Sequence, residues 1–414
     1  MKFDSLDLAS DRAASLLRAA AAKYGDWLLA AADRLDHFLL LGAEAAPGLW
    51  FIGAKTTSSD QATPARSLSV GGGGLDAADA MVACIGEAIE RESQHERPGD
   101  IATSVAIESL NLDPAFEEVM QQLLGRSGDQ LRCSIDLVNA RSLDGGDPVL
   151  LPADWCLRRA LPGMLRIPGA ALSTGCAAGT DFNDAAVRAL LELIERDAAA
   201  LWWLGGVPPL GVAAESLAGI AAVTTLEELR RGAAGRRTLL LDISSDLGVP
   251  VCAAVSHEAD GRGLACGIAA RLSPAAAAKA ALIEMCQMEL GLELARYKQS
   301  TLGAEHLTGD DTRHLHRART IDVAIGDRFR PQNGAQDISQ RMSRGSGNEL
   351  AGLAEVLAAS GIAAWLVDLS RPEWPRHVVK AIAPGLQLFP ADLPVTRLSK
   401  LPSKVATAVT VMPF

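Results

Sequence analysis

The sequence predicts an α+β fold with mixed or antiparallel sheets. Its predicted strands and helices alternate irregularly, without the strand–helix–strand order of a doubly wound parallel sheet. Three apolar segments at 237–243, 250–257 and 263–270 follow one another with only short turns between them, which is typical of antiparallel neighbours. A glycine-containing turn at 144–148, inside an alternating segment at 129–160, predicts a further hairpin.

The remaining elements follow from the spacing of apolar residues and from capping residues, glycines and prolines at their ends. The predicted helices are 10–45, 76–94, 181–204, 273–298 and 348–360. Further strands are predicted at 49–54 and 362–369, and 300–347 is predicted to be loop with a short helix. Two glycine-rich segments at 67–74 and 173–180 lead into helices. They are either tight turns or loops that present backbone N–H groups to phosphate.

Length and composition allow a sizeable core. The chain has 414 residues, which suggests two or three domains or one large one. Apolar residues make up 49% and charged residues 21%, so the chain is neither disordered nor fibrous. A formal net charge of −11 argues against a general nucleic-acid binder. It does not argue against ATP, because a divalent cation can bridge acidic residues to phosphate.

Cysteine usage predicts a reducing compartment. The seven cysteines are an odd number and no two are spaced as Cys-x-x-Cys, so we expect neither a disulfide framework nor a structural zinc site. The first residues include acids where a signal peptide needs a basic region. No run of about 18 apolar residues lacks charge. We therefore expect a cytoplasmic protein that does not enter a membrane.

Three of the predicted helices share one layout. Each begins with a residue suited to capping a helix, namely Asp76, Asp181 or Ser273. Each carries a glutamate eleven residues after that cap and a second polar residue three positions later. These pairs are Glu87 with Glu90, Glu192 with Glu195, and Glu284 with Gln287. Residues three apart share a helix face, with about 5–6 Å between their β carbons, so each helix offers two oxygen ligands at one height.

We expect the three helices to pack around a common cavity in which five carboxylates and an amide converge. Such a cluster cannot stay ionised and unpaired in a low-dielectric interior. Magnesium binds carboxylate and phosphate oxygens together and does not require a cage made of protein alone. Since the sequence contains no phosphate-binding loop motif, the repeat predicts a Mg²⁺–nucleotide site built from acids in the middle of helices.

The alternative is that these acids are solvated. A single Glu-x-x-Glu-Arg segment is most often an exposed helix face with local ion pairs. The threefold recurrence with one cap-to-acid offset argues against that interpretation, and so do the apolar residues that flank the acids. In the first two helices these flanking residues are Ala83, Ile85, Ala88, Ile89, Leu190, Leu191, Leu193 and Ile194.

At these helices the sequence resembles the YcaO family. The matching segments are GGGGLDAADAMVACIGEAIERES at 71–93, STGCAAGTDFNDAAVRALLELIERDA at 173–198, and SPAAAAKAALIEMCQ at 273–287. The resemblance implies a YcaO-like fold whose three motif helices converge on an acidic nucleotide site. We expect a helical and strand region over 1–60, a YcaO catalytic core over 61–383 and a proline-punctuated tail over 384–414.

The resemblance implies an ATP- and Mg²⁺-dependent cyclodehydratase. In such an enzyme, a Cys, Ser or Thr side chain of a ribosomally made precursor peptide attacks the preceding carbonyl, ATP phosphorylates the oxyanion, and loss of phosphate leaves a thiazoline or oxazoline. By resemblance, magnesium and the phosphates are held by Glu87, Glu90, Glu192, Glu195 and Glu284, with Asp184 as a further, shorter metal ligand. The resemblance also assigns nucleotide contacts to Arg91, Thr180, Asp184, Arg196 and Gln287.

The sequence departs from the family pattern in three places. Gly73 stands where the first glycine segment usually has a lysine, and Thr174 stands where the second usually has an asparagine. Many azoline-forming members end in Pro-x-Pro-x-Pro, whereas this chain ends Val-Met-Pro-Phe. The missing lysine favours a different function, a non-catalytic scaffold subunit of a modification complex.

The family also leaves partners and product open. The chain is too short for the peptide-clamp domain that some members carry, so we expect a separate leader-binding clamp subunit and a flavin-dependent dehydrogenase, with a homodimer within the complex as an open alternative. Related members use a sulfide source and make a thioamide instead of an azoline. The sequence does not choose between these products.

Overall fold

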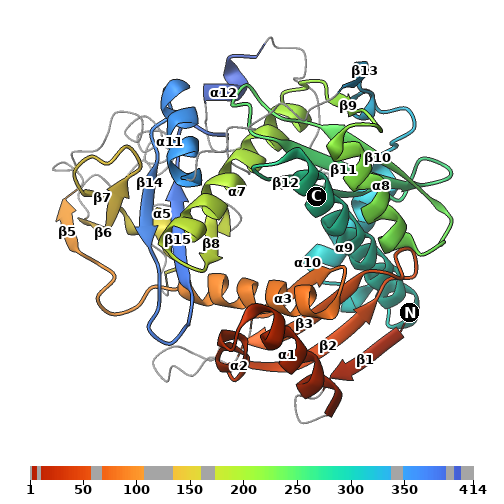
Figure 1. The fold of residues 1–414 in the computed structure, drawn as a ribbon, viewed down its shortest axis with the longest axis horizontal. Coiled ribbons are helices and arrows are strands. Elements are labelled where there is room, and N and C mark those ends of the chain that lie inside the picture. Colours follow the sequence, from red (N-terminus) through yellow and green to blue (C-terminus); the bar gives the residue numbers. More distant parts are fainter. Residues whose placement is uncertain are drawn as a thin grey trace. The chain divides into compact units, whose positions relative to one another are not determined.

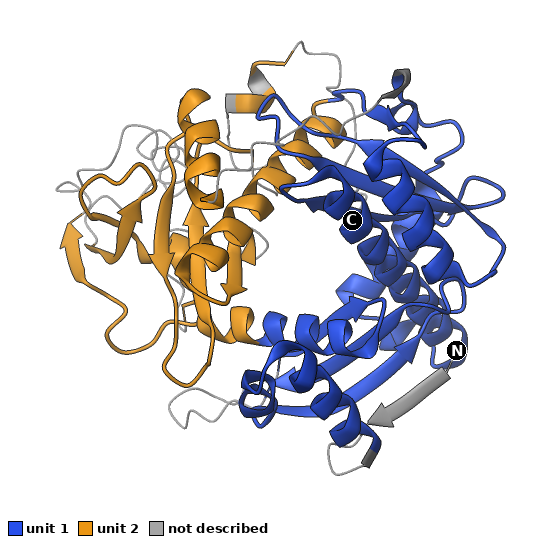
Figure 2. Cartoon of the chain, viewed as in Figure 1, with its two compact units in different colours: residues 1–88, 206–343, 405–414 blue, residues 89–205, 344–404 orange. Residues whose placement is uncertain are grey.

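The computed structural model describes residues 2–6, 11–56, 68–106, 134–159, 173–336, 348–387 and 396–401. The chain divides into two compact units (Figure 2). Unit 1 comprises 1–88, 206–343 and 405–414, and unit 2 comprises 89–205 and 344–404. The boundary falls inside helix α3 (Ala77–Ser93), so each unit holds part of that helix. The division into 1–60, 61–383 and 384–414 that the sequence predicts stays a prediction.

Unit 1 begins with a four-stranded antiparallel sheet whose strands lie in chain order (Figure 1). The strands are β1 (Lys2–Leu6), β2 (Leu35–Gly42), β3 (Trp50–Thr56) and β4 (Ser69–Gly74). Helices α1 (Asp11–Tyr24) and α2 (Trp27–Ala32) lie between β1 and β2 in the chain. The predicted helix over 10–45 is therefore wrong in two places: it is interrupted at Gly25, whose φ is +105°, and it gives way to strand β2 after α2. The leucines of 35–41 fit a helical or a strand period, and pairing with β3 decides between them.

The glycine run at 71–74 belongs to strand β4. A β carbon on Gly72 would lie 2.2 Å from the backbone nitrogen of Cys84 on α3, and one on Gly74 would lie 2.5 Å from Asp79 Cβ. Glycine thus lets α3 lie closer to the strand than any side chain would allow. The run is thus the end of a strand that leads into α3, where the sequence predicted either a tight turn or a phosphate-binding loop.

A second sheet of unit 1 has the strand order β12-β11-β10-β9-β13. Its strands are β9 (Leu210–Val212), β10 (Arg236–Asp242), β11 (Val251–Glu258), β12 (Ala265–Ala270) and β13 (Gln332–Gln336). The three central segments pair antiparallel, as predicted, whereas β13 pairs parallel with β9. The helices of this part are α8 (Leu217–Arg230), α9 (Pro274–Thr301) and α10 (Gly309–Thr320), with 3₁₀ turns at Ala304–His306 and Asp327–Phe329.

Helix α9 lies along β11 and β12 and beside α8 (Figure 1). Its apolar side chains, among them Leu282, Met285 and Leu290, are buried in a core that also includes Leu49 and Leu229. This burial fixes which face of α9 points away from the sheet. The rotation of the acidic motif on α9 is therefore set by the core of unit 1.

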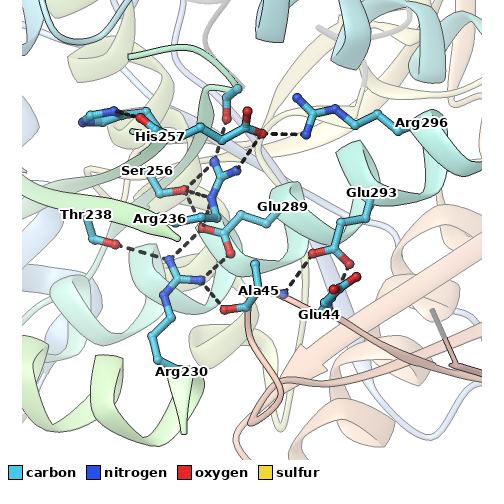
Figure 3. Close-up of polar contacts among 12 residues, drawn as sticks. Glu44, Ala45, Arg230, Arg236, Thr238, Ser256, His257, Glu289, Glu293 and Arg296 are labelled. Carbon is cyan, nitrogen blue, oxygen red and sulfur yellow. Dashed lines mark hydrogen bonds and ion pairs between the residues drawn. The ribbon is translucent and has the colours of Figure 1, made fainter. Parts of the chain in front are cut away.

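A buried charge network further fixes α9 (Figure 3). Glu289 is 1% exposed and accepts hydrogen bonds from Arg230 at 2.6 and 2.7 Å and from Arg236 at 3.0 Å. Ser256 donates to the same carboxylate. One turn further on, Glu293 accepts two backbone N–H groups from the segment before β3. The network links α9 to α8, β10 and β11, and Glu293 links α9 to the segment between β2 and β3.

Unit 2 is built on a sheet of order β5-β6-β14-β15-β8, with β7 paired to β6. Its strands are β5 (Thr103–Ala106), β6 (Ser134–Ser142), β7 (Val149–Pro152), β8 (Cys176–Gly179), β14 (Trp365–Asp368) and β15 (His377–Ile382). Its helices, besides the end of α3, are α5 (Ala153–Cys156), α7 (Phe182–Trp203), α11 (Glu349–Ala359) and α12 (Thr396–Ser399). The hairpin β6–β7 was predicted, whereas β15 was not.

The fold class is confirmed as α+β with mostly antiparallel sheets. Among the described strands, the only parallel pair is β9 with β13. No helix in the described part of the chain is both long and apolar enough to span a bilayer.

Candidate functional site

Each motif helix follows a strand and begins at a side-chain cap. The backbone N–H of Asp79 donates to Asp76 Oδ1 at 2.8 Å, that of Asp184 to Asp181 Oδ1 at 2.9 Å, and that of Ala276 to Ser273 Oγ at 3.2 Å. Such caps satisfy one of the unpaired N–H groups at a helix start. The chain thus repeats one strand–turn–helix unit three times, as β4–α3, β8–α7 and β12–α9.

The first glutamate of each pair is bound to the strand that leads into its own helix. The backbone N–H of Gly71 donates to Glu87 Oε2 at 2.6 Å. That of Gly175, just ahead of β8, donates to Glu192 Oε2 at 2.9 Å. That of Ile268 donates to Glu284 Oε2 at 3.1 Å. The eleven-residue offset from cap to acid therefore has a structural meaning: it sets the height at which a helix glutamate meets the backbone of the preceding strand.

These bonds orient the carboxylates without neutralising them. A hydrogen bond to a charged acceptor contributes about 1.5–3 kcal/mol, and a backbone N–H brings no counter-charge and does not titrate. A carboxylate held in this way has a fixed direction and receives no counter-charge from its backbone donor. That is a suitable state for an acid that is to bind a divalent cation.

Unit 1 brings together the first and third motifs. Glu87 on α3 and Glu284 on α9 are each anchored within this unit. Strand β4 lies against α9, and a β carbon on Gly73 would fall 2.6 Å from Gln287 Nε2. The glycine that replaces the family lysine thus borders the amide of the third motif.

Unit 2 brings together the second acid of α3 and both acids of α7. Glu90 accepts the backbone N–H of Ala178 on β8 at 2.9 Å, close to the Gly175 N–H that binds Glu192. Glu195 is 7% exposed. Arg196 Nη2 lies 3.8 Å from Glu192 Oε1 and 3.6 Å from Glu195 Oε1, so a cation already accompanies these two acids.

The remaining predicted residues have mixed roles. Asp184 accepts from Thr180 N–H at 2.8 Å, from Thr180 Oγ1 at 3.1 Å and from Arg188 Nε at 2.9 Å, which makes it part of the start of α7. Burial acts to raise the pKa of Asp184, but the bonds from Arg188 and Thr180 outweigh it and hold that pKa below its ordinary value. Arg91 lies on the unit 2 part of α3, one residue after Glu90.

The donor set fits a Mg²⁺–nucleotide pair. Carboxylate and amide oxygens suit a hard divalent cation, and arginine suits phosphate. Among the described residues, no three Asp, Glu, His or Cys side chains are grouped closely enough to hold a metal ion by themselves. Magnesium usually keeps waters and substrate phosphates as ligands, so it does not need such a group. That all six motif residues meet at one site stays a prediction.

Two features of unit 2 were missed from the sequence. Lys380 on β15 is fully buried and donates to the carbonyl of Thr174 in the second motif. Asp197, at the end of the same motif, is buried and pairs with Arg397 on α12 at 2.8 Å. The signal for the first was a lone lysine in the apolar segment 378–383. The second gave none, because Arg397 lies 200 residues from Asp197.

The motif cysteines are not suited to nucleophilic chemistry. Cys84 and Cys286 are buried and free, and burial raises the pKa of both thiols well above the ordinary value. A thiol held in its neutral form is a poor nucleophile. Both are therefore packing residues.

Comparisons with known proteins identify the family. The sequence model of the YcaO family, described as a YcaO cyclodehydratase, ATP- and Mg²⁺-binding, matches residues 71–387. An uncharacterised protein from Methanothermobacter thermautotrophicus is 26% identical over 332 residues, which cover 78% of this chain and 82% of the relative. A protein of Rhizobium leguminosarum bv. trifolii, known only as uncharacterised and in the tfuA 3′ region, is 27% identical over 77% of this chain and 76% of its own.

Solved structures share the fold. A heterocyclase in complex with substrate and cofactor has a TM-score of 0.74 and 20% identity, over 96% of this chain but 57% of its own. The heterocyclase TruD has a TM-score of 0.60 and 20% identity over 82% of this chain and 50% of its own, so the chain spans about half the length of both heterocyclases.

Two shorter proteins are matched over most of their length. YcaO from Methanopyrus kandleri, bound with AMPPCP and Mg²⁺, has a TM-score of 0.58 and 18% identity over 92% of this chain and 94% of its own. The match to the E. coli microcin synthetase McbBCD complex with pro-MccB17 has a TM-score of 0.58 and 14% identity, over 81% of this chain and 88% of the matched chain. Since the family match covers well over half of the 414 residues, this chain belongs to the YcaO family, which binds ATP and Mg²⁺.

Proposed function

We propose that this chain is an ATP-dependent cyclodehydratase subunit that forms thiazoline or oxazoline rings in a ribosomally made precursor peptide. The observation that carries the proposal is the threefold anchoring of a helix glutamate by a strand N–H, because it holds acids ready for Mg²⁺–ATP in each of the three family motifs. Membership of an ATP- and Mg²⁺-binding family supports the cofactors.

The proposed reaction is a dehydration of the peptide backbone that is driven by ATP. A Cys, Ser or Thr side chain of the peptide loses its S–H or O–H proton and forms a bond to the preceding carbonyl carbon, and the carbonyl oxygen becomes an oxyanion. That oxygen takes the γ-phosphoryl group and ADP leaves. The carbon–oxygen bond then breaks, phosphate departs with the former amide oxygen, and the amide nitrogen loses its proton as the C=N bond forms. Bound magnesium would neutralise the negative charge of the phosphates, and the motif glutamates would hold the metal in place.

The partners follow from the relatives. The E. coli microcin synthetase is a complex that was solved with pro-MccB17 bound, and this chain spans about half the length of two heterocyclases. The bound pro-MccB17 supports a precursor peptide as substrate, and the existence of a multisubunit synthetase supports a separate leader-binding clamp subunit. A flavin-dependent dehydrogenase acting on the azoline, and a cytoplasmic location, belong to the same proposal.

The test combines isotope and mass measurements. The full chain and a candidate clamp subunit from its gene neighbourhood are incubated with Mg²⁺–ATP and a candidate precursor peptide that carries ¹⁸O in its backbone carbonyls. We expect ADP, phosphate that carries ¹⁸O, and a labelled peptide that loses about 20 Da per ring, the formula mass of water with ¹⁸O; the unlabelled precursor should lose about 18 Da per ring. Azoline formation is contradicted if the unlabelled precursor, incubated with added sulfide, gains about 16 Da, the mass change of amide-to-thioamide conversion. A complex with unchanged peptide and no ADP would support the scaffold alternative.

A further inference from the structure

Lys380 lies in an apolar part of unit 2. It is 1% exposed, on β15, in a segment whose neighbours Val379 and Ala381 are also buried. Its Nζ donates to the carbonyl oxygen of Thr174 at 2.5 Å. Burying an ammonium group costs several kcal/mol unless its surroundings compensate, so a lysine here calls for a reason other than packing.

The carbonyl that Lys380 binds belongs to the turn that anchors Glu192. Gly175 has φ +76°, and a β carbon there would lie 2.7 Å from Leu193 Cδ2 and 2.9 Å from the carbonyl oxygen of Ala381. This left-handed conformation is open to glycine and strained for other residues. The turn thus adopts an unusual conformation in a confined space, and it presents the Gly175 N–H to Glu192 Oε2 at 2.9 Å.

Strand β15 holds this turn at two successive residues. Ala381 N–H donates to the Gly175 carbonyl at 2.7 Å, and Lys380 binds the carbonyl of the residue before. The peptide group between Thr174 and Gly175 therefore has its oxygen fixed by Lys380 and its N–H fixed by Glu192. Rotation of this peptide would break both contacts together.

The positive charge of Lys380 also acts on Glu192 directly, through electrostatic attraction. Burial lowers the pKa of Lys380, while Cys176, Cys156 and Glu192 act against that shift and Arg158 adds to it. The ammonium group and the Glu192 carboxylate thus lie within electrostatic reach at the two ends of one peptide group. A methionine of similar length would avoid the desolvation cost and lose both effects.

We propose that Lys380 is a positioning residue for Mg²⁺–nucleotide binding, which acts by locking the Thr174–Gly175 peptide that orients Glu192. The inference rests on the proposed function, because it needs Glu192 to serve the metal and phosphates. It assigns a task to a residue outside the three motifs.

The test measures how nucleotide binding depends on Mg²⁺. Binding of a non-hydrolysable ATP analogue to the full chain is measured by calorimetry over a range of Mg²⁺ concentrations. For Lys380→Met we expect the Mg²⁺ concentration for half-maximal binding to rise about tenfold, the lower end of the usual effect of changing a residue that orients a metal ligand. The thermal midpoint should stay equal or rise, because a buried charge is removed.

Lys298→Met is the matched control. Lys298 is a partly buried lysine whose partner is a buried carboxylate, that of Asp311, at 2.8 Å, and it lies eleven residues beyond Gln287 on α9. This variant should lower the thermal midpoint and leave the Mg²⁺ dependence unchanged. Should Lys380→Met fail to fold, Lys380→Gln, which keeps a donor and removes the charge, should show the same shift in a smaller degree.

The outcomes separate the two proposals. Wild-type Mg²⁺ dependence in the folded Lys380 variant overturns the positioning role while leaving the proposed function in place. A loss of binding that only parallels a loss of stability also overturns it, because that result describes a structural lysine. A wild-type chain that binds no Mg²⁺–nucleotide overturns the proposed function, and this inference with it.

Discussion

Gly73 on β4 and Gln287 on α9 lie so close that a β carbon on the glycine would fall 2.6 Å from Gln287 Nε2. The contact joins the first motif to the third within unit 1. A lysine is usual at this position in the resembled family, but here the Gln287 side chain fills the space that any side chain on residue 73 would enter first. The absent lysine is thus linked to the placement of Gln287, which weakens it as an argument for a scaffold without catalysis.

Gly73→Ala should therefore act through Gln287. The added methyl group displaces the amide, and we expect Mg²⁺–nucleotide binding to weaken by about 1 kcal/mol, the low end for overpacking. In a Gln287→Ala background the collision is absent, so Gly73→Ala should then have almost no effect. A double-mutant cycle on the dissociation constant measures this coupling. Additive effects of the two substitutions would show that the contact is irrelevant to the site.

The sequence predicted the elements that depend on local pattern and missed those set by distant pairing. The three motif helices and their caps at Asp76, Asp181 and Ser273 were found because capping and helical periodicity are local. The leucines of strand β2 predict helix because their own spacing does not reveal the pairing with β3. The Glu residues were found by repetition, but their strand N–H partners, such as Gly71 for Glu87, were not. Those partners depend on how each helix lies on its strand.

The anchoring of Glu192 predicts a difference between two substitutions. Glu192→Gln keeps an oxygen that can accept from Gly175 N–H, so its free energy of unfolding should stay close to that of the wild type. Glu192→Ala leaves that buried N–H without its acceptor and should lower it by about 1–3 kcal/mol. Both variants lose the charge, so both should lose ATP turnover. Urea unfolding and ADP release measure the two effects, and equal stability of the two variants would contradict the anchor.

The network around Glu289 predicts a large loss of stability. Glu289→Ala leaves Arg230 and Arg236 buried without their shared carboxylate, and breaking a buried pair from one side typically costs about 3–5 kcal/mol. Adding Arg230→Met should recover part of this loss, because one of the uncompensated charges is removed. Denaturant unfolding measures both variants. If the double variant is less stable than Glu289→Ala, the buried charge is not what destabilises the single variant.

Two glycines are predicted to respond in opposite ways to substitution by alanine: Gly267, where β12 packs closely on α9, and Gly352, which has open space around it. A β carbon on Gly267 would lie 2.2 Å from the Met285 backbone nitrogen, so Gly267→Ala must push the motif helix away from its strand. We expect a loss of stability above about 2 kcal/mol and weaker Mg²⁺–nucleotide binding, since Glu284 moves with the helix. Gly352 on α11 has open space around its β-carbon position. Gly352→Ala should stabilise the chain by about 0.5–1 kcal/mol. Thermal unfolding compares them, and a tolerated Gly267→Ala would show that the approach is not tight.

His314 on α10 predicts how stability depends on pH. Burial, with a contribution from Arg317, lowers the pKa of His314 to about 4, while Asp311 acts against the shift. The unfolded chain, with a histidine pKa of about 6.5, then binds more protons than the folded chain between these two values. The contribution of His314 to stability is therefore complete above about pH 6.5 and is lost as the pH falls toward 4. In His314→Gln the thermal midpoint should fall less steeply over this range. His316→Gln, at an exposed position two residues on, is the control and should keep the wild-type slope. If His314→Gln also keeps that slope, another group causes the acid sensitivity.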